Sequence, residues 1–169
     1  MVDFDVVELE EADHVEVGEQ APDFVRPLVN DEYWQNTSLS ELTDDGPVLL
    51  VFHPMDGAFP STYIWNELRD RELGEQLTVV GCSISDPYAH KRFIGERGMD
   101  YRLFSDPSAE VAREYGIDHE LDGMAGIREP RPAVFLLDEE RTVQYAWVAS
   151  QWPEFPDYDE IESAVESHT

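Results

Sequence analysis

Two short, unbroken runs of apolar residues stand out near the middle of the chain. Residues 48–52 read Val-Leu-Leu-Val-Phe, and residues 77–84 form a second run. Such runs are typical of strands that are covered on both faces of a sheet. Between them, Ile64, Trp65 and Leu68 have the spacing of one helix face. A helix that connects two strands of one sheet predicts that the strands are parallel.

Two Asp-Pro pairs predict the starts of further helices. In Asp86-Pro87 and in Asp106-Pro107 a capping carboxylate precedes a proline at the first helical position, where its missing N–H costs nothing. The second of these helices is expected to end at Gly116, a good C-terminal stop.

The last third of the chain predicts a hairpin and a final helix. The apolar run 133–137 is followed by a charged turn at 138–141 and by the alternating residues 143–147, and an amphipathic helix follows Asp157. The complete order is strand, helix, strand, helix, short strand, helix, strand, strand, helix. It predicts an α/β fold with a mixed central sheet and helices on both faces, which a thioredoxin-like sandwich fits.

The length and ends of the chain suggest one compact domain. The chain has 169 residues, and we expect a single domain over 15–169 after an acidic segment, 1–14, that either frays or pairs as an edge strand. No apolar run approaches the roughly 20 residues needed to cross a bilayer, and the first residues are acidic where a signal peptide would be basic. The expected location is cytoplasmic, without a membrane partner.

Charge narrows the classes of partner. The chain has 38 Asp and Glu residues against 11 Lys and Arg residues, a formal net charge of −27. Such a surface repels nucleic acid and anionic membranes, so neither is an expected partner. It is typical of halophilic proteins, because molar salt shortens the screening length to roughly 3 Å and so removes the self-repulsion. Charge therefore indicates an environment and not a function.

Several segments in sequence order resemble one family. They are GEQAPDF (18–24), LSELTDDGPVLLVFHP (39–54), VVGCSISDPYAHKRFIGERG (79–98), SDPSAEVAREYGI (105–117), PAVFLLDEERTVQYAWV (132–148) and PDYDEI (156–161). Together they resemble the peroxiredoxins, the alkyl hydroperoxide reductase and thiol-specific antioxidant (AhpC/TSA) family. The resemblance implies a redoxin domain with the thioredoxin fold, and an antioxidant oxidoreductase activity that reduces peroxides with a thiol.

The resemblance also implies a site, which this sequence supplies only in part. In the family a Pro-x-x-x-Thr-x-x-Cys motif follows the first core strand. Pro54 matches the proline, but Ala58 falls at the threonine and Ser61 at the cysteine. An alignment shifted by two residues places Tyr63 there instead, although an Arg-Asp pair at 69–70 supports the first register. Neither alignment supplies a thiol.

The arginine that completes the family's pocket is displaced as well. Pro132 falls at its position, while Arg131 lies one residue earlier and Arg128 four residues earlier, so either side chain is a candidate to reach the pocket. A proline directly before this strand resembles thioredoxins, in which the equivalent bond is cis. We therefore expect a cis Arg131–Pro132 bond.

Serine at position 61 predicts that the peroxide-reducing cycle does not run. A hydroxyl is harder to ionise than a thiol and forms no counterpart of the reversible sulfenic acid. A laboratory substitution would not explain Ala58, so a natural loss is favoured. Two other roles for Ser61 are a nucleophile assisted by His53, although no G-x-S-x-G elbow surrounds it, and a cap for a helix that starts near Thr62.

The single cysteine, Cys82, excludes an internal disulfide and a CxxC motif. Its place within an apolar run predicts a buried core residue. The alternative is an active thiol oxidoreductase that uses Cys82 or the thiol of a partner.

The favoured hypothesis is therefore a non-peroxidase member of the family that binds a small ligand or a protein partner. We expect no cofactor and no metal site, because the five histidines show no paired ligand spacing. The resemblance allows a homodimer. Trp147, Trp152 and Phe155 are the first candidates for its contact surface, although packing over the sheet edge is favoured for them.

Overall fold

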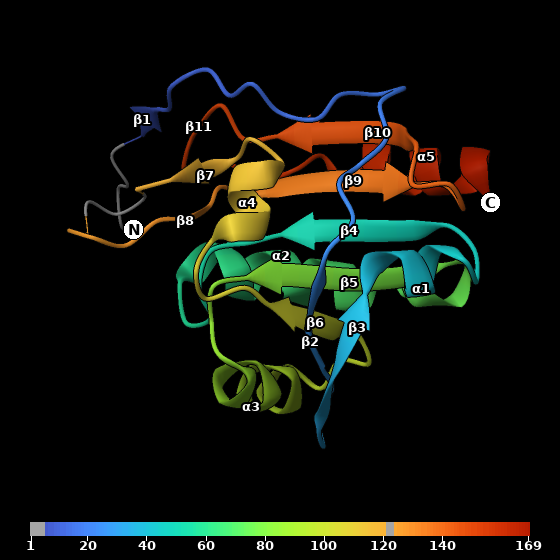
Figure 1. Ribbon diagram of the computed structural model, residues 1–169, viewed down its shortest axis with the longest axis horizontal. Helices are drawn as coiled ribbons and strands as arrows, with labels where there is room; N and C mark the ends of the chain where they lie inside the picture. Colours follow the sequence, from blue (N-terminus) through green and yellow to red (C-terminus); the bar gives the residue numbers. More distant parts are fainter. Residues whose placement is uncertain (1–5, 121–123) are drawn as a thin grey trace.

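A seven-stranded mixed sheet forms the centre of the molecule in the computed structural model, which describes residues 6–120 and 124–169. The strands run across Figure 1 in the spatial order β10-β9-β4-β5-β6-β2-β3. Their bounds are β2 (Val25–Val29), β3 (Trp34–Ser38), β4 (Val48–Phe52), β5 (Thr78–Ser83), β6 (Arg102–Ser105), β9 (Ala133–Leu137) and β10 (Val143–Val148).

The pairing of the central strands confirms the expected topology. β4 and β5 are parallel, with Val48 opposite Thr78 and Phe52 opposite Cys82. β9 and β10 form the antiparallel hairpin, and β9 also pairs antiparallel with β4. The sheet is therefore mixed, as the order of elements predicts.

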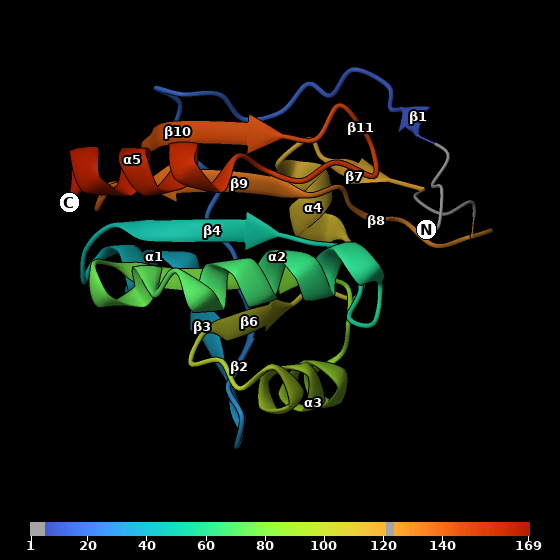
Figure 2. The same ribbon diagram turned by 180° about the vertical axis from the view of Figure 1, so that it is seen from behind.

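Helices cover both faces of this sheet (Figures 1 and 2). They are α1 (Leu39–Thr43), α2 (Phe59–Asp70), α3 (Pro87–Arg97), α4 (Glu110–Glu114) and α5 (Tyr158–His168). Side chains of α1 and α4 belong to one buried cluster, and those of α2, α3 and α5 to the other. Alternate residues of β4 point into each cluster, because successive side chains of a strand face opposite ways. No helix in the described ranges is long and apolar enough to cross a membrane.

Two short strand pairs lie outside the main sheet. β1 (Val7–Glu8) pairs with β11 (Gln151–Trp152), and β7 (Asp118–His119) pairs with β8 (Glu129–Pro130). A single 3-10 turn, η1 (Leu73–Glu75), precedes β5. Of the two alternatives for the acidic segment 1–14, its described part takes the strand pairing.

One helix start differs from the expectation. The helix after Asp86 begins at Pro87 as expected, but α4 begins at Glu110 and not at Pro107. Ala109, with φ of 60°, turns the chain just before α4. The carboxylate of Asp106 still serves this helix, since it accepts a hydrogen bond from the N–H of Val111 at 3.0 Å. The proline lies in the turn between the capping side chain and the helix.

Gly81 on β5 offers a direct test of the packing between α2 and the sheet. A β-carbon at this position would collide with the ring of Trp65 and with Leu103. We expect Gly81→Ala to lower the free energy of unfolding by about 1–3 kcal/mol, measured by urea denaturation. Gly95→Ala is the control, because Gly95 lies in α3 with open space around it. This variant should raise the free energy of unfolding by about 0.5–1 kcal/mol. Equal effects of the two substitutions would contradict the packing described.

Candidate functional site

Ser61 lies in the first turn of α2 and is completely buried. The helix begins at Phe59, and Ala58 is its N-cap residue with an extended backbone and no side-chain hydrogen bond. The expectation that Ser61 caps a helix starting near Thr62 is therefore wrong. The chain is already helical three residues before the expected start, and the serine hydroxyl is directed to the loop that leads into α2.

The Ser61 hydroxyl donates a hydrogen bond of 2.6 Å to the carbonyl oxygen of Pro54. Nδ1 of His53 lies 2.9 Å from the same oxygen. A carbonyl oxygen only accepts, so Nδ1 carries the proton of the neutral ring. Nδ1 is 3.4 Å from the Ser61 oxygen and, being protonated, cannot take the hydroxyl proton. The geometry does not support the alternative in which His53 activates Ser61 as a nucleophile.

His53 is held neutral by its surroundings. Its ring is fully buried and lies against Trp65 and Phe93. Burial lowers the pKa of His53 to about 4; the charge of His90 acts in the same direction and that of Asp56 opposes it. Its Nε2 has no hydrogen-bond partner among the described residues.

A second buried histidine is paired with a carboxylate beside this ring. Nδ1 of His90 lies 2.7 Å from Oδ2 of Asp56, and Nε2 lies 3.0 Å from the carbonyl oxygen of Phe104. Both ring nitrogens are thus within hydrogen-bond distance of an oxygen that can accept. No group of three or more His, Cys, Asp or Glu in the described part of the chain has the geometry of a metal site. Sequence reasoning missed this pair, because 34 residues separate its members and no motif connects them.

The backbone donors of the loop after Pro54 are occupied by side chains. The N–H of Met55 donates to Oε2 of Glu129 at 3.3 Å, and the N–H of Asp56 donates to the hydroxyl of Ser85 at 2.7 Å. Glu129 lies on β8 and is itself buried. A carboxylate of the chain therefore takes the place at which an external oxygen atom would bind to the Met55 N–H.

Neither candidate arginine is directed to Ser61. Arg131 is almost completely buried, and its Nη1 donates to the carbonyl oxygens of Glu10 at 3.0 Å and Ala149 at 3.3 Å. Burial lowers the pKa of this guanidinium. Arg128 pairs with Asp118 at 2.7 Å on the surface. No hydrogen bond within residues 6–120 and 124–169 joins Ser61 to an arginine.

The prediction of a cis bond before Pro132 is wrong, since the cis peptide bond found in the described part of the chain is Trp152–Pro153. Backbone hydrogen bonds hold the chain on both sides of Pro132, which lies in a bend just before β9. The N–H of Arg131 donates to the carbonyl oxygen of Ile117, and the carbonyl oxygen of Pro132 accepts from the N–H of Ala149 at 2.9 Å. Pro132 thus continues directly into β9 and does not border an open site.

Cys82 is a core residue, as expected. It lies on β5 with 1% of its surface exposed and belongs to the cluster beneath α1 and α4. Burial raises the pKa of its thiol well above the ordinary value, with a smaller contribution in the same direction from the charge of Asp106. The thiolate, which is the reactive form, is therefore strongly disfavoured.

An aromatic cluster covers the start of α2. Phe59 lies 6.5 Å from Trp152 and 6.4 Å from Phe155 between ring centres, and Tyr63 is 6.1 Å from Phe155. Two residues of the expected aromatic patch thus meet at this helix, whereas Trp147 packs against the core on the α5 side. Tyr63, the alternative match to the family's cysteine, is 61% exposed on the outer side of the helix.

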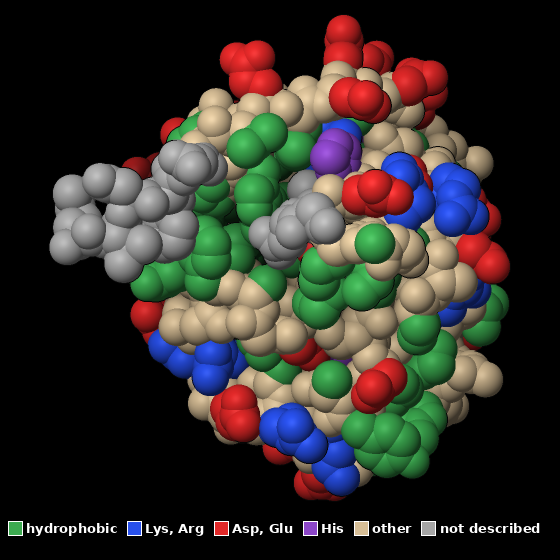
Figure 3. All heavy atoms as spheres, turned by 90° about the vertical axis from the view of Figure 1, so that its left-hand side faces the viewer, with side chains coloured by type: hydrophobic (Ala, Val, Ile, Leu, Met, Phe, Trp, Pro, Cys, Tyr) green, Lys and Arg blue, Asp and Glu red, His purple; other side chains and the backbone are tan. Residues whose placement is uncertain are grey.

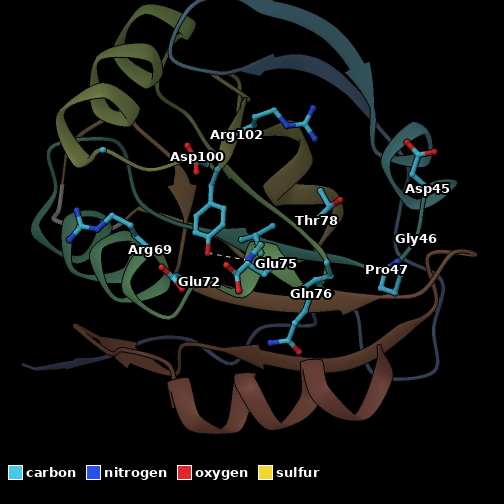
Figure 4. Close-up of a pocket in the computed structure, with 15 residues that line it drawn as sticks. Asp45, Gly46, Pro47, Arg69, Glu72, Glu75, Gln76, Thr78, Asp100 and Arg102 are labelled. Atoms are coloured by element: carbon cyan, nitrogen blue, oxygen red, sulfur yellow. Dashed lines mark hydrogen bonds between the residues drawn. The ribbon is translucent and has the colours of Figure 1, made fainter.

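Two hollows in the structure lie away from Ser61. A cavity of about 710 Å³ is found where β4, β5 and β6 begin, at the opposite end of α2 from Ser61 (Figure 4). Asp45, Thr78 and Arg102 are among the side chains that line it. A second hollow of about 460 Å³ follows α3. Neither is lined by Ser61, Pro54 or Ala58.

Comparison with known proteins identifies what the chain is similar to. The model of the AhpC/TSA family matches residues 17–146. A putative peroxiredoxin of Synechocystis is 33% identical over 143 residues, which cover 78% of this chain and 68% of that protein. A thiol peroxidase of Staphylococcus saprophyticus is 30% identical over 158 residues, covering 91% and 88%. The crystal structure of peroxidoxin BcpB from Mycobacterium tuberculosis superimposes with a TM-score of 0.74 at 28% identity, covering 91% of this chain and 96% of that one. This structural match confirms the thioredoxin-like fold.

The lowered pKa of His53 predicts acid sensitivity. The unfolded chain takes up a proton near the ordinary pKa of 6.5, whereas the folded chain does so only near 4. The contribution of neutral His53 to the free energy of unfolding is therefore fully present above about pH 6.5. It is lost as the pH drops toward 4, by about 3 kcal/mol in total. In urea denaturation between pH 7.5 and 4, His53→Gln should show a shallower loss than the unsubstituted protein. His168→Gln, a substitution at the exposed C-terminus, should lose stability with falling pH as steeply as the unsubstituted protein does. If His53→Gln also loses stability this steeply, the assignment to His53 is refuted.

Proposed function

The chain belongs to the AhpC/TSA family, and we propose that within this family it is a non-peroxidase member that binds a small ligand or a protein partner. The observation that carries the proposal is the state of Ser61. Its hydroxyl is buried and its proton is directed to the carbonyl oxygen of Pro54. Oxygen at this place cannot take up an oxidising equivalent and return it, as a thiolate does through a sulfenic acid.

The surroundings of Ser61 support the proposal independently of the missing sulfur. A reactive thiolate needs a nearby cation and access to its substrate. The guanidinium of Arg131 is bound to backbone carbonyl groups, and Glu129 brings a carboxylate to the loop. An isolated change of serine back to cysteine would thus place the sulfur in a closed site to which neither Arg128 nor Arg131 is directed.

The alternative is a thiol oxidoreductase that uses Cys82 or the thiol of a partner. Burial of Cys82 in the core and the raised pKa of its thiol oppose the first version. The cavity at the start of the parallel strands and the hollow along α3 are two places at which a non-redox ligand or partner would find open space.

Peroxide consumption tests the proposal. With hydrogen peroxide and dithiothreitol, the purified protein should show no turnover above the rate of the reductant alone. The Ser61→Ala and Cys82→Ser variants should behave identically to it. Turnover that Ser61→Ala abolishes would refute the proposal, and turnover that only Cys82→Ser abolishes would establish the alternative.

Thiol labelling measures the access to Cys82 directly. With an aromatic disulfide reagent the native protein should react much more slowly than after denaturation, because a buried thiol with a raised pKa is inert. Glu139→Cys provides an exposed thiol in the same protein as a fast-reacting reference. Labelling of native Cys82 at the rate of this reference would show that the core opens readily and would restore redox chemistry at Cys82.

A further inference from the structure

The β2–β3 hairpin leaves one edge of the main sheet open. β3 is the terminal strand and pairs with β2 alone in the described part of the chain. Pro27 lies opposite Asn36 and has no N–H, so this pair cannot exchange two hydrogen bonds. The N–H and carbonyl groups of Asn36 therefore face outward, where another strand would bind.

Residues 34–38 show none of the usual protection of an edge strand. They read Trp-Gln-Asn-Thr-Ser, without charge or proline, in a chain in which 29% of residues are charged. Natural edge strands are commonly blocked by lysine, proline or a bulge. At the opposite edge of the sheet, by contrast, the N-terminal segment covers part of β10, where Gly18 and Glu19 exchange backbone hydrogen bonds with Val143.

An aromatic pair connects the open edge to α3. The rings of Trp34 and Tyr88 meet edge to face at 5.0 Å, and both are exposed, Tyr88 by 67%. Tyr88, Lys91, Arg92 and Gly95 follow the i, i+3, i+4, i+7 spacing of one helix face. The hollow of about 460 Å³ lies along this face. The lower part of Figure 3, where α3 lies, shows Lys and Arg side chains beside hydrophobic ones.

The cations of this face are unusual for the chain. Arg26, Arg71 and Arg128 each pair with two or more carboxylates. The side chains of Lys91 and Arg92, in contrast, have no hydrogen bond or ion pair with any residue that the structure describes.

Two carboxylates share the hollow with these cations. Glu96 is engaged by Arg97 at 3.8 Å, which leaves Asp31 as the second acidic lining residue. The two cations therefore remain available to an external carboxylate on a molecule whose surface is otherwise strongly negative.

We propose that an extended acidic peptide segment of a partner protein adds to β3 as a further strand. Its backbone pairs with the outward groups of Asn36, and its carboxylates on the α3 side bind Lys91 and Arg92, while Trp34 and Tyr88 contact its apolar atoms. Backbone pairing of this kind supplies affinity, and alternate side chains supply specificity. The inference deepens the proposed function and rests on it, since it names the partner of a member that does not reduce peroxide.

The probe is a fluorescent seven-residue peptide, acetylated and amidated, in which Thr and Glu alternate. Fluorescence anisotropy should show saturable binding to the full chain, and the same peptide with Lys in place of Glu should not bind. Arg92→Glu should weaken binding by at least about threefold. Arg113→Glu makes the same change of charge at an exposed arginine on α4. This control should weaken peptide binding by less than about 1.5-fold. Equal losses in both variants would indicate a non-specific charge effect and overturn the inference.

Strand addition itself is tested with N-methylated probes. One peptide is methylated on the N–H groups of its Glu residues and the other on those of its Thr residues, so that only one series blocks the bonds to β3. One of the two methylated peptides should therefore lose binding to the protein, and the other should keep it. Asn36→Pro should also abolish binding, with circular dichroism as the check of folding; if this variant does not fold, the methylated pair still decides.

Other outcomes separate this inference from the proposed function. If binding is unaffected by either methylation, the inference fails. Absent peptide binding together with absent peroxide turnover overturns the inference alone. Peptide binding together with peroxide turnover that Ser61→Ala abolishes overturns the proposed function alone.

Discussion

One carbonyl oxygen organises the turn from β4 into α2. Pro54 accepts the Ser61 hydroxyl at 2.6 Å and His53 Nδ1 at 2.9 Å. The two bonds satisfy polar groups that are completely buried, which would each cost free energy if left unpaired. They also fix the tautomer of His53 and the direction of the Ser61 hydroxyl. The chemistry that remains possible at this site follows from that arrangement, because both side chains have already donated their protons to the backbone.

The polar groups around Ser61 and His53 are also bound by other groups of the chain. Asp56 is bound to His90, the Met55 N–H to Glu129, and the Arg131 guanidinium to backbone carbonyl groups. In the AhpC/TSA fold this is the region at which the resemblance places the reacting sulfur. Here its polar groups bind one another, and packing of the two cores keeps the family's architecture with a serine at this place.

The sequence was informative where the hydrophobic pattern is strong and local. The runs at 48–52 and 133–137 predicted central strands, and the helix between residues 52 and 77 predicted that β5 is parallel to β4. The β2–β3 hairpin was missed because few of its residues are buried and Pro27 weakens the strand signal. The start of α4 was misplaced because Asp106 reaches the helix across a turn. The His90–Asp56 pair and Glu129 depend on contacts between distant segments, which no periodicity records. Motif counting located Ser61 but could not show the direction of its hydroxyl.

The buried position of Cys82 has a consequence for the covalent state of the chain. A disulfide to another molecule, or addition of a small thiol, requires the sulfur to leave the core, and so requires a large part of the sheet to separate first. Burial of the single thiol therefore ties any disulfide exchange at Cys82 to the rate at which the core opens.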